Sequence, residues 1–112
     1  MEINKLIARI TEENSKNLEK FFKYYFFINS GDNNYFIQSK ERGTNLVLAS
    51  FIPSQKPGCI EVHLSFSSPS KIGRKKEFNL GAANSDEKEI SRVIKETTEW
   101  SLQTIQKELG RK

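Results

Sequence analysis

The apolar positions in the first part of the chain recur with the spacing of an α-helix. The positions that share one helical stripe are Ile3, Leu6, Ile7, Ile10, Leu18 and Phe21. Such a stripe predicts an N-terminal amphipathic helix. Asn14 falls on the same stripe, within the polar stretch TEENSKN, so we expect the helix to break or bend there.

The next segment, FFKYYFFI at residues 21–28, contains half of the aromatic residues of the chain. Part of it would continue the helical stripe, but aromatic residues have a strong preference for β-strands. The turn cluster NSGDNN and the run YFIQS follow directly. We therefore favour a hairpin that pairs Phe22–Ile28 with Tyr35–Ser39 over the alternative of one long helix.

Three later segments predict further strands. LVLASFI, residues 46–52, is apolar on both faces, as is typical of a central strand. CIEVHLSFS, which starts at Cys59, alternates strictly between apolar and polar residues and predicts a half-buried antiparallel strand. The stretch SSPSKIGRKK is expected to be a loop, and EFNL a short fifth strand.

A second helix is predicted to begin near Asp86. Asp86 and Glu89 have the spacing of a capping pair, and Glu87 suits the positive end of the helix dipole. The positions expected on its inner face are Ile90, Val93, Ile94, Thr97, Trp100, Ser101 and Ile105. The predicted fold is α+β, with an N-terminal helix, an antiparallel sheet of four to five strands in meander order, and a C-terminal helix.

Size and composition agree with one folded domain over residues 1–112. The chain is 36% hydrophobic and 29% charged, which is typical of globular proteins. Cys59 is the only cysteine, so an internal disulfide is excluded. The first residues lack the pattern of a signal peptide, and no apolar run is long enough to cross a membrane. We expect a soluble, cytoplasmic protein with no membrane contact.

The residues that usually carry catalysis do not form a recognisable group. His63 and Cys59 lie four residues apart on one predicted strand, about 13 Å from each other at about 3.3 Å per residue. That separation is too long for a nucleophile and its base or for a shared metal ion. The glycines do not form a phosphate-binding motif. We expect a non-enzymatic protein without a metal or cofactor.

The net charge of +4 is distributed unevenly. Residues 15–76 carry ten Lys and Arg against four Asp and Glu, whereas the segments before and after are close to neutral. The stretch SKIGRKKEF holds Lys71, Arg74, Lys75 and Lys76, which on a loop could follow a phosphate backbone. The alternative is a solvated hairpin tip that aids solubility.

The predicted sheet has two apolar faces in its first half. Residues 21–28 and 46–52 place apolar side chains on both sides, and each side needs a cover. We expect the two helices to cover opposite faces, so that the aromatic run belongs mostly to the core. A second copy of the chain or a ligand are the other covers, and the wide apolar arc of the last helix makes a homodimer a reasonable addition.

These features support two hypotheses for function. The first is a sequence-tolerant binder of single-stranded nucleic acid, because such proteins combine a basic groove with aromatic stacking platforms. Besides the basic loop, its candidate residues are Lys23, Tyr25, Lys40 and Arg42. A strand meander followed by a helix resembles the layout of Whirly-type single-strand binders, although the leading helix is not part of that layout.

The second hypothesis is a protein–protein interaction module, such as an inhibitor, an immunity or antitoxin-like protein, or an adaptor. Its basic residues would then meet an acidic patch on the partner protein. The nucleic-acid hypothesis depends on one condition: the cations must gather on a single continuous surface.

Overall fold

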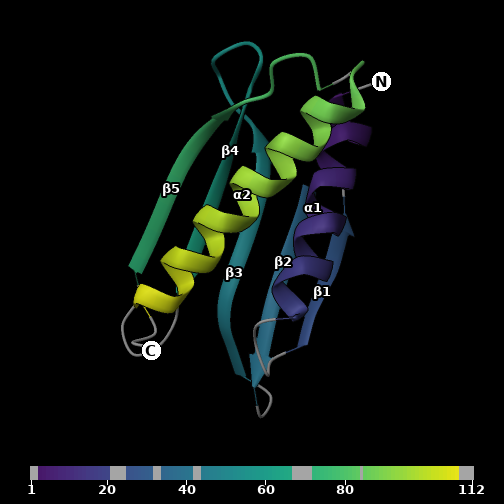
Figure 1. The fold of residues 1–112 in the computed structure, drawn as a ribbon. Helices are drawn as coiled ribbons and strands as arrows, with labels where there is room; N and C mark the ends of the chain where they lie inside the picture. The colour runs from purple at the N-terminus through teal and green to yellow at the C-terminus, as the bar shows by residue number, and fades with distance from the viewer. Residues whose placement is uncertain are drawn as a thin grey trace.

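The computed structural model describes residues 3–20, 25–31, 34–41, 44–66, 72–83 and 85–108. Within these ranges, residues 3–4, 25–31, 34–41 and 44–46 are described by their backbone alone. The elements in chain order are α1 (Ile3–Glu19), β1 (Tyr25–Gly31), β2 (Asn34–Glu41), β3 (Thr44–Pro53), β4 (Cys59–Phe66), β5 (Ile72–Asn79) and α2 (Glu87–Glu108) (Figure 1).

The strands form one antiparallel sheet in the order β1-β2-β3-β4-β5. The predicted α+β class is confirmed: one helix precedes the strands in the sequence and the other follows them. Side chains are described for three of these strands, β3, β4 and β5, and for β1 and β2 the description ends at the backbone register.

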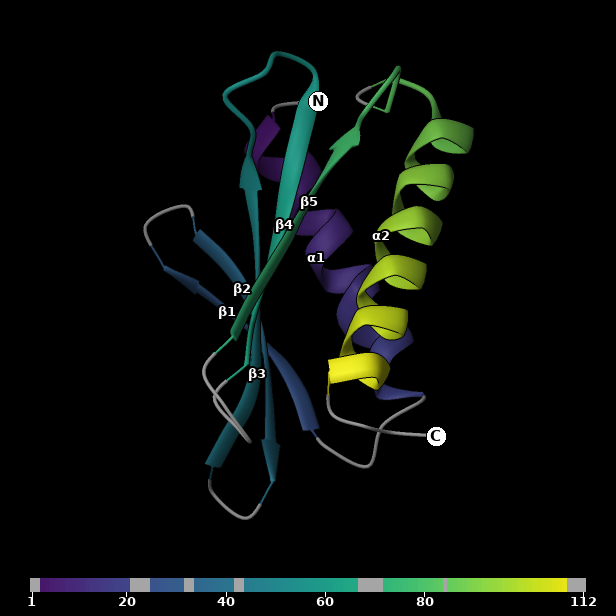
Figure 2. The ribbon, with the colours of Figure 1, turned by 90° about the vertical axis from the view of Figure 1, so that its left-hand side faces the viewer.

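Both helices pack on the same face of the sheet, with the other face turned away from them (Figure 2). The buried residues of β3 and β4 lie at alternate positions and join one apolar cluster with both helices. Its members include Leu6, Ile7, Ile10, Val47, Ala49, Phe51, Ile60, Val62, Leu64, Val93 and Ile105. The prediction of one helix on each face is wrong. The polar alternate positions of β4 leave only one face of that strand apolar enough to attract a helix.

The predicted hairpin is present in the described part of the segment. Tyr25 to Gly31 pair with Asn34 to Lys40 in antiparallel register, and Phe22–Tyr24 lie outside the described residues. The strands extend further than predicted, because the polar residues Asn29 to Gly31 continue the pairing. The turn is correspondingly shorter than the cluster NSGDNN suggested.

The predictions for the middle strands are confirmed, and the predicted fifth strand is present but longer than EFNL. The prediction of a loop is wrong from Ile72 onward. Residues 46–52 lie in the central strand β3, and the apolar residues of β4 are buried while its polar residues are half-buried or exposed. The stretch expected to be a loop supplies most of β5, including Arg74, Lys75 and Lys76. An edge strand tolerates such polar residues, because its ladder hydrogen bonds need no apolar side chains and charge protects its free edge.

The helix α1 does not break at Asn14. This side chain is fully buried, and its Nδ2 donates hydrogen bonds to the Ile10 carbonyl and to Thr97 Oγ1, both at 2.9 Å. Its Oδ1 accepts a hydrogen bond of 3.0 Å from Thr98 Oγ1. Because α2 supplies polar partners at the point of contact, a polar residue on the apolar stripe is accommodated inside an unbroken helix.

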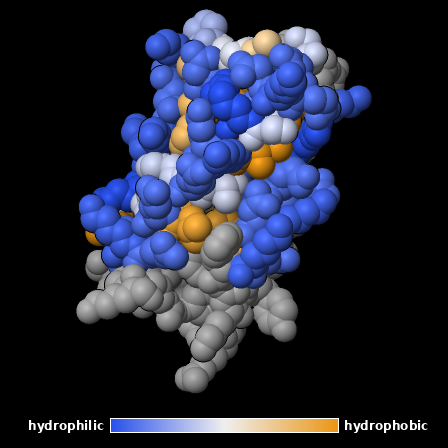
Figure 3. All heavy atoms as spheres, in the orientation of Figure 1, coloured by the Kyte–Doolittle hydropathy of each residue, from blue (hydrophilic) through white to orange (hydrophobic). Residues whose placement is uncertain are grey.

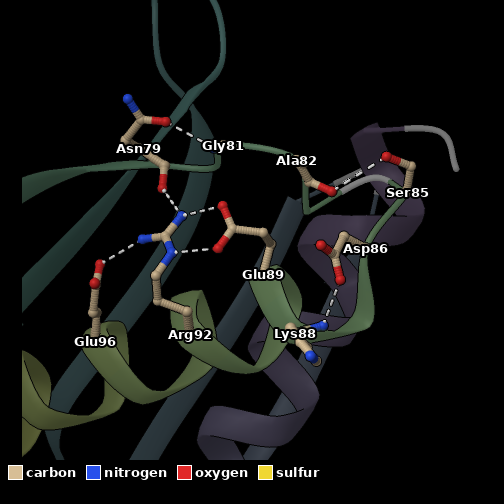
Figure 4. Close-up of polar contacts among 9 residues, drawn as sticks. All are labelled: Asn79, Gly81, Ala82, Ser85, Asp86, Lys88, Glu89, Arg92 and Glu96. Atoms are coloured by element: carbon tan, nitrogen blue, oxygen red, sulfur yellow. Dashed lines mark hydrogen bonds and ion pairs between the residues drawn. The ribbon is translucent and has the colours of Figure 1, made fainter.

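The first turn of α2 is stabilised by one of the two predicted caps (Figure 4). Asp86 Oδ1 accepts a hydrogen bond of 2.9 Å from the Lys88 backbone, as expected of an N-cap residue. Glu89 does not close the capping box, because its carboxylate binds Arg92 instead, at 3.0 Å. Arg92 in turn donates to the Asn79 carbonyl at 3.1 Å, so it joins α2 to the end of β5.

The inner face of α2 is mostly as predicted. Ile90, Val93, Thr97, Ser101 and Ile105 are buried, and Thr98 is buried as well. Ile94 and Trp100 are only partly buried and pack at the margin of the core. Trp100 therefore lies at the edge of the core, where part of it is exposed.

Candidate binding surface

The face of the sheet opposite the helices is called here the open face. On the three strands with described side chains it carries Leu48, Ser50, Ile52, Glu61, His63, Ser65, Gly73, Lys75 and Glu77. These positions alternate with the buried core positions, so the pleat of the sheet places them on the far side. No helix in the described ranges covers this face.

Apolar and small polar residues form the middle of the open face. Leu48 and Ile52 on β3 are half-buried, although the neighbouring Val47, Ala49 and Phe51 are completely buried on the other side. Ser65 on β4 is the register partner of Leu48 and is exposed. Apolar side chains that stay partly accessible on a sheet face leave surface that another protein can bury.

The charges of the open face have both signs. Lys75 is the register partner of His63, and Glu61 is the register partner of Glu77. Two carboxylates directly opposite each other repel, and each finds another partner. Glu61 Oε1 lies 2.8 Å from His63 Nε2, and Glu77 accepts a hydrogen bond from the Ser54 hydroxyl.

The other two cations of β5 lie on the opposite side, next to α2. Arg74 Nη2 forms an ion pair of 3.2 Å with Glu108, and Lys76 Nζ lies 5.4 Å from the centre of the Phe78 ring. Arg74, Lys75 and Lys76 are therefore consecutive in sequence but divided between two faces. In the part of the chain with described side chains, the cations of β5 do not form a single basic surface.

The remaining predicted site residues are placed only in part. Tyr25 and Lys40 are register partners on β1 and β2, at the backbone level. Lys23, Arg42 and Lys71 lie outside the described residues. The structure thus brings Tyr25 near Lys40 and separates Lys75 from its two neighbours along β5.

A hollow of about 320 Å³ lies between β5 and α2. It is lined mainly by Lys76 and Phe78 from the strand and by Glu96, Glu99, Trp100 and Gln103 from the helix. The rings of Phe78 and Trp100 meet edge to face, with centroids 5.9 Å apart. Sequence reasoning missed this hollow because it assigned Trp100 to the core and the basic residues to a loop.

A second hollow of about 550 Å³ lies between the two helices, on the side of the molecule seen in Figure 3. Ile94 and Leu102 supply its apolar lining, and its rim includes Arg9, Glu13 and Lys95. The surface around it is mostly hydrophilic with small apolar patches (Figure 3). Its charges are mixed, so it favours neither an anionic nor a cationic ligand.

The residues considered for catalysis lie apart from these hollows. Cys59 is buried at the start of β4, as predicted, and His63 is half-buried on the polar side of that strand. In the ranges that the structure describes, no three His, Cys, Asp or Glu side chains converge on a metal position. None of the helices described is both long and apolar enough to span a membrane.

Comparison of the chain with protein-family models, with curated protein sequences and with solved structures gave no match.

Proposed function

We propose that this chain is a non-enzymatic protein-binding module and that its open face packs against a partner protein. One observation carries the proposal: both helices lie on one side of the sheet, and the half-buried Leu48 and Ile52 lie on the other. The open face carries apolar residues between charges of both signs. It is therefore complementary to the surface of another protein, which also combines apolar, positive and negative groups.

Nucleic-acid binding, the first expectation from the sequence, is the weaker candidate. Lys75 is the only lysine or arginine at the described open-face positions, and Glu61 and Glu77 share that face with it. The two carboxylates repel a phosphate backbone, and the single lysine attracts it. The repulsion is therefore stronger than the attraction on this face. Arg74 and Lys76 face α2, where Glu108, Glu96 and Glu99 supply negative charge.

The test compares two arginine substitutions that add the same charge in different places. Ser65→Arg puts a long cationic side chain in the middle of the open face, beside Gly73, which leaves room for it. Gln106→Arg puts the same side chain on an exposed position of α2. Each tagged variant and the unmodified chain are used to capture partners from extracts of the native source, with and without nuclease treatment.

We expect the unmodified chain and Gln106→Arg to retain the same partner protein and Ser65→Arg to lose it, with all three melting at similar temperatures. Loss of the partner on nuclease treatment would transfer the proposal to nucleic acid. Equal capture by both variants would show that the open face is not the contact surface. Recovery of the bait alone would remove the proposal.

A further inference from the structure

The charged residues of the open face are arranged in two rows that run across the strands. Glu61 of β4 and Glu77 of β5 are register partners and form an acidic row. His63 and Lys75 are register partners two residues further along, and they form a basic row. At about 3.3 Å per residue, the two rows lie side by side, about 7 Å apart.

Lys75 and Glu77 differ from the other charged residues of β5 in having no partner of opposite charge. Arg74 is held by Glu108, on the side of α2. Within the described residues, Lys75 and Glu77 form no ion pair, and Glu77 accepts only the hydroxyl of Ser54. Both side chains are exposed, so each is free to pair with a charge outside the chain.

The order of the rows decides how a second copy of the chain can stack on this face. Two sheets that stack face to face with two-fold symmetry have their axis either along the strands or across them. An axis along the strands places each row on its own copy, so that carboxylates face carboxylates. An axis across the strands reverses the order of the rows and keeps each strand above its own copy.

We propose that the open face binds a second copy of this chain, in a two-fold dimer whose axis crosses the strands between the acidic row and the basic row. Glu77 of each copy then faces the partner's Lys75, and Glu61 faces the partner's His63. Each pair occurs twice, because a two-fold interface repeats every contact. The inference rests on the proposed function, since it names the partner protein of the open face.

The two kinds of residue on this face have different parts in the dimer. Leu48 and Ile52 are half-buried in the single chain, and their remaining apolar surface is covered when the sheets stack. Lys75 and Glu77 lie on the edge strand β5, at the rim of the interface. Rim charges keep contact with water, so their pairing costs little desolvation and mainly determines the orientation of the partner.

The acidic row is unfavourable in the single chain. Glu61 and Glu77 are directly opposite each other on neighbouring strands, where like charges repel. In the dimer, the partner's basic row lies above them and relieves this repulsion. The arrangement is therefore more favourable in two copies than in one.

The test is an exchange of the two charges of β5. Glu77→Lys alone and Lys75→Glu alone each place like charges opposite one another across the axis. Each should weaken dimerisation by at least about tenfold, because the change acts twice in the dimer. The double variant with both substitutions restores opposite charges and should dimerise like the unmodified chain.

A mixture of the two single variants tests the same geometry between different copies. One variant has two lysines at positions that face two glutamates of the other, so equal amounts should form a mixed dimer. Sedimentation velocity over a range of protein concentrations measures dimerisation, and native mass spectrometry identifies the mixed dimer. Far-UV circular dichroism checks that every variant is folded.

The matched controls make the same charge changes away from the open face. Glu12→Lys on α1 and Lys88→Glu on α2 alter exposed residues of the helices, and both should leave dimerisation unchanged. Equal weakening by the controls would overturn the proposal, because net charge alone would then explain the effect. So would an unmodified chain that stays monomeric at every concentration, or a double variant that is not rescued.

Failure of this inference and failure of the proposed function are distinguishable. If the dimer forms as proposed, the partner captured from extracts should be the untagged native copy of the chain. If the chain is monomeric but Ser65→Arg still loses its native partner, a different protein covers the open face and only the dimer is wrong. If the chain is monomeric and Ser65→Arg retains the partner, both proposals are wrong.

Discussion

Asn14 shows how one residue can be misjudged from sequence and explained by its neighbours. A buried amide without partners would cost several kcal/mol, so a polar residue on an apolar stripe predicts a break. Thr97 and Thr98 remove that cost, because their hydroxyls bind the amide from the opposite helix. They lie more than 80 residues away in the chain, and no local pattern could have paired them with Asn14.

Replacing Asn14 by alanine should lower the free energy of unfolding by about 1–3 kcal/mol, because the Thr98 hydroxyl loses its acceptor in a buried position. The control is Asn14→Leu with Thr98→Val, which removes both polar partners and should cost less than the single change. Urea unfolding measures both. If Asn14→Ala unfolds like the unmodified chain, the hydrogen bonds between the helices are not stabilising.

Ser101 presents the opposite situation. Its Oγ is buried and has no hydrogen-bond partner within the described residues. Ser101→Ala should therefore raise the free energy of unfolding, by about 1 kcal/mol, because a desolvated hydroxyl is removed and alanine is the better helix former. A loss of stability in thermal unfolding would mean that this hydroxyl has a partner.

At the level of elements, the turn between β5 and α2 depends on a glycine. Gly81 has a φ of 56°, in the left-handed region, and a Cβ at this position would meet the Glu89 carboxylate that binds Arg92. Its backbone N–H donates to Asn79 Oδ1 at 2.7 Å. Gly58, in the β3–β4 connection, has a φ of 77° but nothing within 4 Å of a Cβ.

These two glycines form a matched pair for mutation. Gly58→Ala should cost about 1–2 kcal/mol from backbone strain alone. Gly81→Ala should cost more, because the new methyl group also displaces Glu89 from Arg92. When Glu89→Ala is also present, Gly81→Ala should cost no more than Gly58→Ala. Denaturant unfolding of each glycine variant, with and without Glu89→Ala, measures these costs. Equal costs for the two glycines would show that the methyl group does not disturb the ion pair.

The elements themselves could be predicted to different degrees from sequence. β4 was predictable because its alternation reports directly on one buried face, and α2 because its apolar spacing and Asp86 cap are local signals. β5 was not predictable from its side chains. Backbone hydrogen bonds to β4 hold it in place. The run Arg74–Lys76 can be a strand because it lies at the edge of the sheet, and only the complete sheet determines which strand is at the edge.

At the scale of the whole molecule, ion pairs at the start of α2 join it to the other elements. Arg9 of α1 binds Glu87 through two hydrogen bonds of 2.8 Å, and Arg92 links Glu89 to the end of β5. The Arg9 guanidinium lowers the pKa of Glu87, and the Arg92 guanidinium lowers the pKa of Glu89. Both carboxylates are thus better stabilised as anions in the folded chain than in the unfolded one.

This arrangement predicts a loss of stability in acid. Since the pKa of Glu89 in the folded state lies below its ordinary value of 4.5, its stabilising effect is complete above that value. The effect is lost as the pH falls through the lowered pKa. The melting temperature of Glu89→Gln should therefore lie below that of the unmodified chain near neutral pH, and the two should converge as the pH falls below 4.5.

Lys88→Gln is the control, because Lys88 is an exposed residue in the same turn. The difference in melting temperature between Lys88→Gln and the unmodified chain should not disappear as the pH falls below 4.5. A gap for Glu89→Gln that stays constant with pH would show that the ion pair with Arg92 does not contribute.

The whole-molecule arrangement was the least accessible from sequence. The class of fold followed from local periodicity, but the choice of face for each helix depends on which helix surfaces fit each other. The buried contact of Asn14 with Thr97 and Thr98 places the helices side by side, and that contact leaves the open face without either of them. The candidate surface could therefore not be located before the helices were placed.

The pairing of Asn14 with Thr97 also bears on the order of events during folding. The two residues are separated by 83 positions, whereas neighbouring strands of a meander are joined by short connections. Closing the longer loop costs more chain entropy, so we expect the strands to pair before the two helices meet. The seam between the helices should then form after the rate-limiting barrier, and weakening it would accelerate unfolding while leaving the refolding rate almost unchanged.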